Sequence, residues 1–252
     1  MSSPEDIYMH RPIALFAVAA LLSLGLAGPA SAHFLWLEPE ADGARLYFGE
    51  FEENLREASP GLLDRLTPLP EAKLVASSGA KPLKVEKSPT AFVITGGRGP
   101  TDSIVAEQVR VNERKQGDKV TRTLGRLAAR YVPDFSERAP TLTLDIAPAG
   151  KPGAFKVVYK DKPLPKAKLE LINQSGWKRE LRTDEQGAIT VALPWKGNYV
   201  IEVEHLDPTA GTQATEAYDG MRFVSTLSFK VADGGEAPPT PAAFTPKREM
   251  NR

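Results

Sequence analysis

Two histidines, His33 and His205, are the residues of this chain whose type and placement could bind a metal ion. The sequence has three histidines and no cysteine, which excludes thiolate metal sites and thiol nucleophiles. His33 follows Ala30-Ser31-Ala32, an A-x-A pattern typical of a signal-peptide cleavage site. Cleavage after Ala32 would make His33 the first residue of the mature chain. Its α-amino nitrogen and its imidazole Nδ1, once deprotonated, could then close a six-membered chelate ring on one metal ion.

His205 is placed to complete such a site from the end of a strand. Side chains alternate along the segment 198–205, so His205 shares a face with the apolar row Tyr199, Ile201 and Val203. It therefore ends the core-facing row, next to a loop where a ligand would be both ordered and reachable. Nitrogen donors of this kind suit copper(II) and nickel(II), and cobalt and zinc accept them too.

Carboxylates could add a further ligand, and five are candidates: Glu38, Glu50, Glu52, Glu53 and Asp207. Instead of binding a metal ion, each histidine could be a hydrogen-bonded structural residue at the end of a strand. Each carboxylate could be a solvated charge or a helix cap. At the level of sequence both interpretations stay open. We expect the metal, if bound, to be a divalent transition-metal ion (nickel, cobalt or copper), held by His33 and His205.

Signals for other chemistry are weak. No G-x-S-x-G surrounds any serine, and the glycine-rich stretch 96–100 lacks the Lys-Ser/Thr of a phosphate-binding loop. Trp177 and Trp195 flank a turn and could form a carbohydrate platform, but packing within a hairpin is the favoured interpretation. The sequence therefore favours a protein that is not an enzyme.

The N-terminal segment predicts export. Arg11 precedes an apolar run over 13–28 that ends at the A-x-A pattern, which is typical of a secretory signal. The run is short for a bilayer span, and no second one follows. Glu5 and Asp6 are atypical in such a leader, so a start at Met9 and an uncleaved anchor are the alternatives. We expect a periplasmic or secreted protein without a membrane span after cleavage. The balance of 32 basic and 32 acidic residues gives no indication of nucleic-acid binding.

Short apolar runs separated by turn residues predict a mainly β fold. We expect Ig-like or prealbumin-like β-sandwich units with one short helical segment, which we place within 51–72. The stretch 120–135 fits a helix face and a strand equally well. The predicted organisation is a signal peptide over 1–32, an N-terminal β-rich domain with a helical insertion over 33–140, a C-terminal β-sandwich over 141–232, and a disordered tail over 233–252.

Several motifs resemble those of a known family. The start HFLWLEP resembles the H-x-F-W-L-x-P opening of a periplasmic family of unknown function whose members are often labelled nickel-uptake family proteins. Further on, Leu144 to Pro148 resembles that family's L-E-I-x-P, Val157 to Lys168 its D-G-K-P-L hairpin, and Thr183 to Gly187 its T-D-x-x-G turn. The last motif also occurs in prealbumin-like and carboxypeptidase-regulatory-like modules. His33 and His205 fall on the family's histidines, whereas the segment 51–66 does not match its pattern.

The resemblance implies an exported protein that handles a transition metal. Our leading hypothesis is a periplasmic nickel, cobalt or copper binding or delivery protein, with the metal ion and an inner-membrane metal transporter as partners. The alternative is a non-catalytic β-sandwich adhesion or scaffold module in which both histidines are structural. A copper-dependent oxygenase with the same ligands is the lower alternative, because the sequence shows no substrate platform. The terminal-histidine sites of such copper proteins are similar by analogy only.

Overall fold

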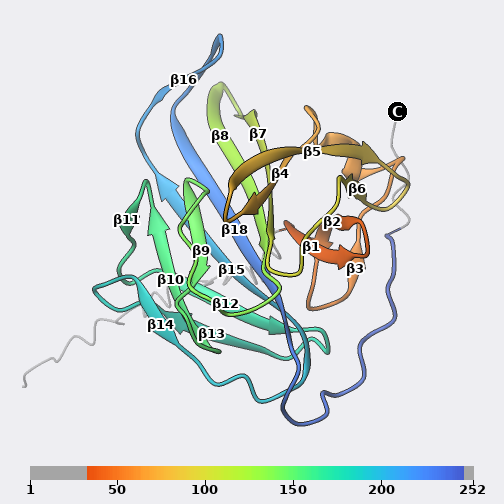
Figure 1. The fold of residues 1–252 in the computed structure, drawn as a ribbon. Coiled ribbons are helices and arrows are strands. Elements are labelled where there is room, and N and C mark those ends of the chain that lie inside the picture. Colours follow the sequence, from red (N-terminus) through yellow and green to blue (C-terminus); the bar gives the residue numbers. More distant parts are fainter. Residues whose placement is uncertain (1–32, 247–252) are drawn as a thin grey trace, which may run out of the picture. The chain divides into compact units, whose positions relative to one another are not determined.

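A computed structural model describes residues 33–246, so the predicted signal peptide and its cleavage site lie outside the described residues. The fold is mainly β, as predicted, with several sheets (Figure 1), and residues 33–246 contain one short helix. In the first half the elements are β1 (Phe34–Glu40), β2 (Gly43–Glu50), β3 (Leu55–Arg56), the 3-10 helix η1 (Leu62–Arg65), β4 (Glu71–Ala76), β5 (Gly79–Lys87), β6 (Phe92–Thr95), β7 (Ser103–Gln116) and β8 (Lys119–Tyr131).

The second half contributes ten strands and no helix among the described residues. They are β9 (Leu144–Pro148), β10 (Ala154–Tyr159), β11 (Lys162–Pro163), β12 (Lys168–Asn173), β13 (Lys178–Arg182), β14 (Ala188–Thr190), β15 (Gly197–Asp207), β16 (Gly211–Gln213), β17 (Glu216–Tyr218) and β18 (Gly220–Val231). The helical segment predicted within 51–72 is confirmed as the single turn η1. The ambiguous stretch 120–135 is mostly strand, because β8 pairs along its length with β7 and β18.

One twelve-stranded sheet runs through both halves of the chain. Its order is β1-β2-β6-β5-β4-β7-β8-β18-β15-β12-β13, with β3 paired to β2 off this path. The junction is the parallel pairing of β8 with β18, while the neighbouring pairs are antiparallel. Both predicted domains contribute strands to this sheet. The domain boundary near residue 140 stays a prediction.

The first strand is buried on both faces, as its unbroken apolar run predicts. Leu35 and Leu37 point into a core shared with β4, β6, β7 and β8. Phe34 and Trp36 point the other way and pack with Val200 of β15 and Val224 of β18. All four residues of the run are at most 4% exposed. The start of the strand, where His33 lies, is therefore held firmly from two sides.

Hydroxyl side chains of β18 form hydrogen bonds with the backbone groups on the edge of β1 that does not pair with β2. The backbone N–H of Leu37 donates to Ser228 Oγ at 3.2 Å, and Thr226 Oγ1–H donates to the carbonyl of Leu35 at 2.6 Å. Both hydroxyl residues are buried. An edge strand normally exposes such groups to water or to another strand. Here the alternating Thr and Ser of β18 replace a partner strand and fix β1 across the sheet.

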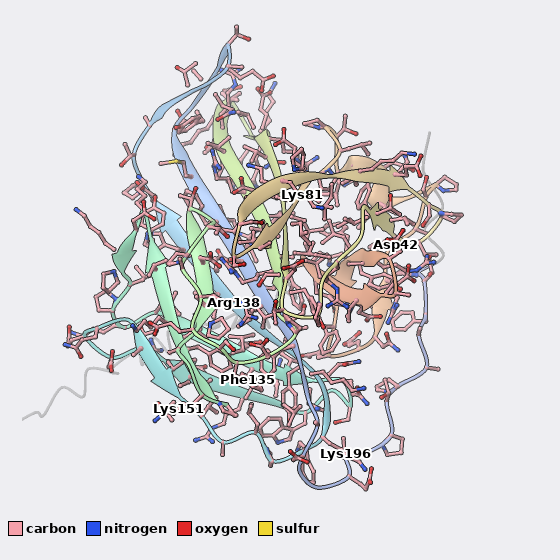
Figure 2. All side chains as sticks on the ribbon, in the orientation of Figure 1. Asp42, Lys81, Phe135, Arg138, Lys151 and Lys196 are labelled. Atoms are coloured by element: carbon pink, nitrogen blue, oxygen red, sulfur yellow. The ribbon has the colours of Figure 1, made fainter. Side chains whose placement is uncertain are left out.

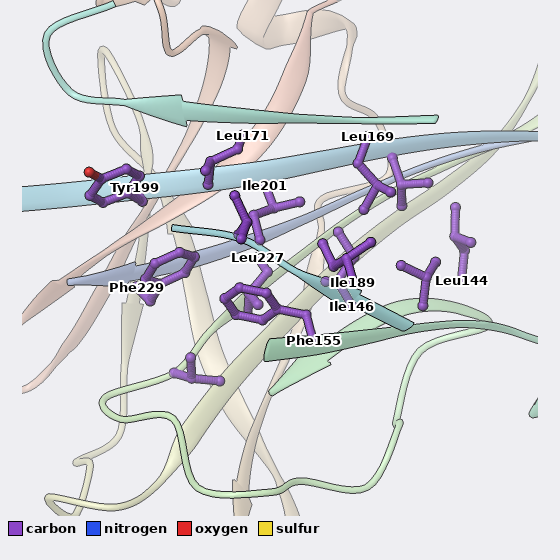
Figure 3. Close-up of a cluster of buried hydrophobic side chains, with 14 of the residues drawn as sticks. Leu144, Ile146, Phe155, Leu169, Leu171, Ile189, Tyr199, Ile201, Leu227 and Phe229 are labelled. Carbon is purple, nitrogen blue, oxygen red and sulfur yellow. The ribbon is translucent and has the colours of Figure 1, made fainter. Parts of the chain in front are cut away.

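The second half forms the expected sandwich. A four-stranded sheet made of β9, β10, β11 and β14 packs on the β12–β15–β18 part of the large sheet. Figure 3 shows the core between them, in which Phe155, Tyr199 and Phe229 lie among branched aliphatic side chains. The predicted turn at 183–187 is confirmed: Asp184 Oδ1 accepts the N–H groups of Gln186 and Ala188, and Gly187 takes a φ of 70°.

The connection from β8 to β9 is fixed by a buried ion pair. Arg130 and Asp145 are fully buried, and Arg130 Nε donates to Asp145 Oδ1 at 3.0 Å. Asp145 also accepts the backbone N–H of Thr141 at 2.7 Å. Phe135 and Arg138, labelled in Figure 2, lie on this connection, and the Phe135 ring packs 5.3 Å from that of Phe229. Removing one partner of a buried pair leaves the other charge uncompensated, so this contact ties the connection to the sheet.

The C-terminal segment makes backbone contacts at two places. Gly235 forms a bridge with Trp195, and Phe244 forms a parallel bridge with Leu55 of β3. Most side chains between them are exposed. That the tail over 233–252 is disordered stays a prediction, and its last six residues lie outside the described part.

Candidate functional site

His33 lies between two buried carboxylates at the start of β1. Its Nε2 is 2.6 Å from Glu57 Oε1, a hydrogen-bond distance, and its Nδ1 is 3.2 Å from Glu50 Oε1. The side chain of His33 is 16% exposed, against 11% for Glu50 and 3% for Glu57. Water therefore reaches the imidazole and, to a smaller extent, Glu50, whereas Glu57 is buried behind them.

Strand pairing brings the three side chains together. In the β1–β2 ladder Phe34 pairs with Gly49, which places Glu50 next to His33. In the β2–β3 ladder Glu50 pairs with Leu55, and the N–H of Glu57 donates to the carbonyl of Phe48 at 2.8 Å. The Phe48 ring lies 5.3 Å from that of His33 and shields one side of it.

Within residues 33–246, Glu50 and Glu57 form ion pairs with His33 and with no other residue. A neutral imidazole has one N–H, so it can donate to one carboxylate while its other nitrogen presents a lone pair. A lone pair facing a carboxylate oxygen is unfavourable unless a proton or another cation lies between them. The Nδ1–Glu50 side of the ring is thus a place for a cation.

His205 lies on the other face of the large sheet. It follows Val203 in the row that faces the sandwich core, as the alternation predicts, and its ring lies 4.3 Å from the ring of Tyr159. Burial lowers the pKa of His205, although the nearby Asp207 acts against this shift.

The carboxylate nearest to His205 is already compensated. Asp207 accepts hydrogen bonds from the Tyr159 hydroxyl, from Lys160 Nζ at 2.9 Å and from the backbone N–H of Thr209 at 2.9 Å. Hydrogen bonding from the Thr209 side chain, and then from Tyr159 and Lys160, holds the pKa of Asp207 well below its usual range. Asp207 therefore needs no further cation.

The structure does not bring His33 and His205 together. Strand β1 packs on the face of the sheet that carries Val200 and Val224, whereas His205 is on the face of the sandwich core. The expectation that His205 completes a site opposite His33 is therefore not met in this structure. No group of three or more His, Asp or Glu side chains arranged to hold a metal ion occurs within residues 33–246. Glu50 and Glu57 face opposite nitrogens of one ring, so they do not converge on a point.

The other candidate carboxylates have different partners. Glu38 accepts from Arg56 at 2.9 Å, and Glu52 lies 2.7 Å from Lys178. Sequence reasoning missed Glu57 as a candidate, although it lies in the acidic stretch that begins at Glu50. No local pattern marks it, because its place beside His33 depends on the pairing of the two-residue strand β3 with β2.

No helix within the described residues is long and apolar enough to cross a membrane. Comparison with curated proteins and with solved structures gives no match. Comparison with protein families matches residues 30–207 to a family described as a domain of unknown function, DUF4198. The match begins three residues before His33, covers the first predicted domain and the second as far as residue 207, and includes His33, Glu50, Glu57 and His205. The chain therefore belongs to the DUF4198 family.

Proposed function

We propose that the exported protein binds a divalent transition-metal ion (nickel, cobalt or copper) at His33, and that it serves in metal delivery or uptake. The observation that carries the proposal is the pairing of His33 Nδ1 with Glu50 Oε1 at 3.2 Å. For metal–ligand bonds near 2.1 Å, two donors on one ion lie about 3.0 Å apart at a right angle and about 3.4 Å apart at a tetrahedral angle. The two atoms already have the separation of neighbouring ligands.

The leader's removal would supply the third donor. Cleavage after Ala32 turns the backbone nitrogen of His33 into an amine, two bonds from the carbon that carries the imidazole. Amine nitrogen, Nδ1 and a Glu50 oxygen then form a mixed nitrogen and oxygen donor set on one side of the ring. Nitrogen-rich sites of this kind favour copper(II) and nickel(II) over the harder cations.

Glu57 supports this arrangement from the other side of the ring. Metal-bound histidines almost always donate their second N–H to a carboxylate or carbonyl, which fixes the tautomer and the ring orientation. The 2.6 Å contact between His33 Nε2 and the buried Glu57 has this form. It leaves the lone pair on Nδ1, the nitrogen that a terminal chelate uses. The site is thus preorganised on a strand that is buried on both faces.

The proposed cellular role rests on the motifs of the sequence. The resemblance of HFLWLEP and the later motifs to proteins labelled as nickel-uptake proteins supports a role in nickel or cobalt handling. It also supports a periplasmic location and an inner-membrane metal transporter as the recipient. His205 is not part of the proposed site, because it lies on the opposite face of the sheet.

The first test is the N-terminus itself. Mass spectrometry of the exported protein should give a mature chain that starts at His33. For binding, one fusion protein can be compared before and after a cleavage that leaves His33 first, by calorimetric titration with copper(II) and with nickel(II). We expect tight binding only after cleavage, and about a tenfold or greater loss of affinity in Glu50→Gln.

Two results would overturn the proposal. Equal affinity before and after cleavage would show that the amine is not a ligand. Absence of binding in both forms would favour the scaffold function, in which His33 only neutralises Glu50 and Glu57.

A further inference from the structure

The C-terminal segment approaches the proposed metal site through β3. The N–H of Arg56 donates to the carbonyl of Phe244 at 3.0 Å, and the N–H of Phe244 donates to the carbonyl of Asn54 at 3.3 Å. Asn54 Nδ2 donates to the carbonyl of Pro241 at 2.8 Å. Segment 237–246, the end of the dark-blue chain in Figure 1, is called the strap below.

The strap covers the outer edge of β3, whose inner edge pairs with β2. On the inner edge Arg56 pairs with Gly49, and Leu55 pairs with Glu50. Residue Glu57 directly follows β3 and holds His33 Nε2. The short strand that positions Glu57 therefore lies between β2, which carries Glu50, and the strap.

The strap is attached through its backbone and adds little to the cores. Its side chains are mostly exposed, and Phe244 itself is 45% exposed. It holds four prolines, Pro238, Pro239, Pro241 and Pro246, which restrict the backbone and lower the entropy lost when such a segment docks. Loss of the strap should therefore free β3 without unfolding the protein.

The geometry points to the strap as a positioning element for the metal site: by pairing with β3 it keeps Glu57 on His33 Nε2, so its displacement lowers metal affinity. This inference rests on the proposed function. The effect is partial, because the Arg56 side chain also contacts strands β1 and β2, through Glu38 at 2.9 Å and the Tyr47 ring at 3.9 Å. Loss of an outer-shell partner typically lowers metal affinity by about 10 to 100-fold, and we expect the lower end.

Two truncations of the mature protein test the inference. One stops after Glu236 and removes the strap, and the control stops after Pro246 and keeps it. In metal-free protein, we expect amide hydrogen exchange at Arg56 and Glu57 to be about tenfold faster in the first truncation than in the control. We also expect its affinity for nickel(II) or copper(II) to be about tenfold lower, with an unchanged melting temperature.

A matched pair of full-length variants separates backbone pairing from side-chain packing. Phe244→Pro removes the N–H that donates to Asn54 and should act like the truncation. Phe244→Ala keeps that N–H and should behave like the wild type.

The imidazole signals in NMR spectra give a readout that a general loss of stability would not produce. After leader removal the chain holds only two histidines. The His33 ring signals should move when the strap is deleted, whereas those of His205 should not.

The outcomes distinguish this inference from the proposed function. Unchanged exchange at Arg56 and Glu57, or an unchanged His33 signal, overturns the role of the strap and leaves the metal site standing. Faster exchange with unchanged metal affinity likewise overturns it. Absence of metal binding in the intact mature protein overturns both proposals.

Discussion

The regions around His33 and His205 contain similar residues, but they differ in how the negative charge of their carboxylates is compensated. Each histidine lies at one end of a strand, next to an aromatic ring and a carboxylate. Asp207, near His205, has a lysine, a tyrosine hydroxyl and a backbone N–H as donors. Glu50 and Glu57 have His33 as their one ion-pair partner within residues 33–246.

This difference indicates that a bound cation would be stabilised near His33 rather than near His205. Buried carboxylates are costly unless they are paired, and a metal ion is one way of pairing them. A carboxylate that already has a lysine partner gains little from a second cation. The cluster around His33 therefore resembles a ligand set because its carboxylates lack a lysine or arginine partner within residues 33–246, and not because it contains a histidine.

The largest expected effect contrasts the two histidines directly. His33→Ala removes one chelating nitrogen and should lower copper(II) or nickel(II) affinity by at least about 100-fold. His205→Ala should leave affinity unchanged, since its side chain is on the other sheet face. Calorimetric titration of the two mature variants measures both. A loss of affinity in His205→Ala equal to that in His33→Ala would show that the two regions form one site.

A smaller effect should follow from the carboxylate behind His33. Glu57→Gln keeps an oxygen acceptor for Nε2–H but removes the charge, and we expect about a tenfold loss of metal affinity. Asp207→Asn is the matched control near the other histidine and should leave metal affinity unchanged. Equal affinities of wild type and Glu57→Gln would remove Glu57 from the site.

Much of the fold could be predicted from local patterns. Alternation over 141–232 predicts the sandwich, and the unbroken apolar run at 34–37 predicts a strand buried on both faces. The stretch 120–135 could not be assigned, because its strand form depends on parallel pairing with β18, nearly 100 residues later.

Only some residues of the candidate site could be predicted from the sequence. The cleavage pattern points to His33, and Glu50 is one of the five candidate carboxylates. Glu57 is not, since a two-residue strand has no periodicity to detect. Nor does alternation along β15 tell which face of the sheet β1 covers, and that long-range packing decides whether His205 can reach His33.

A fourth carboxylate, Glu202, extends the comparison, because burial and its acidic neighbours outweigh the nearby Arg222 and Lys178. Burial and then the neighbouring Glu170 and Glu204 raise the pKa of Glu202 to about 8. The unfolded value is about 4.3, so the folded state binds more protons between these limits and loses stability as pH rises. Glu202→Gln should therefore stabilise the protein by about 1 to 2 kcal/mol at pH 9 and have little effect near pH 4. Urea unfolding at the two pH values measures this, and an equal effect at both would contradict it.

The smallest expected effect concerns the compensated carboxylate. Its hydrogen bonds hold the pKa of Asp207 below the unfolded value of about 3.9, so the stability that the ionised group contributes is present above that pH. It is lost as pH falls through the lower folded value. Asp207→Asn should therefore cost about 1 kcal/mol at pH 7, because the charged acceptor of the Tyr159 and Lys160 contacts is gone. Wild type and variant should converge in urea unfolding as pH falls below about 3. A constant difference across that range would mean that packing, and not charge, sets the cost, and the electrostatic contrast with Glu57 would then fail.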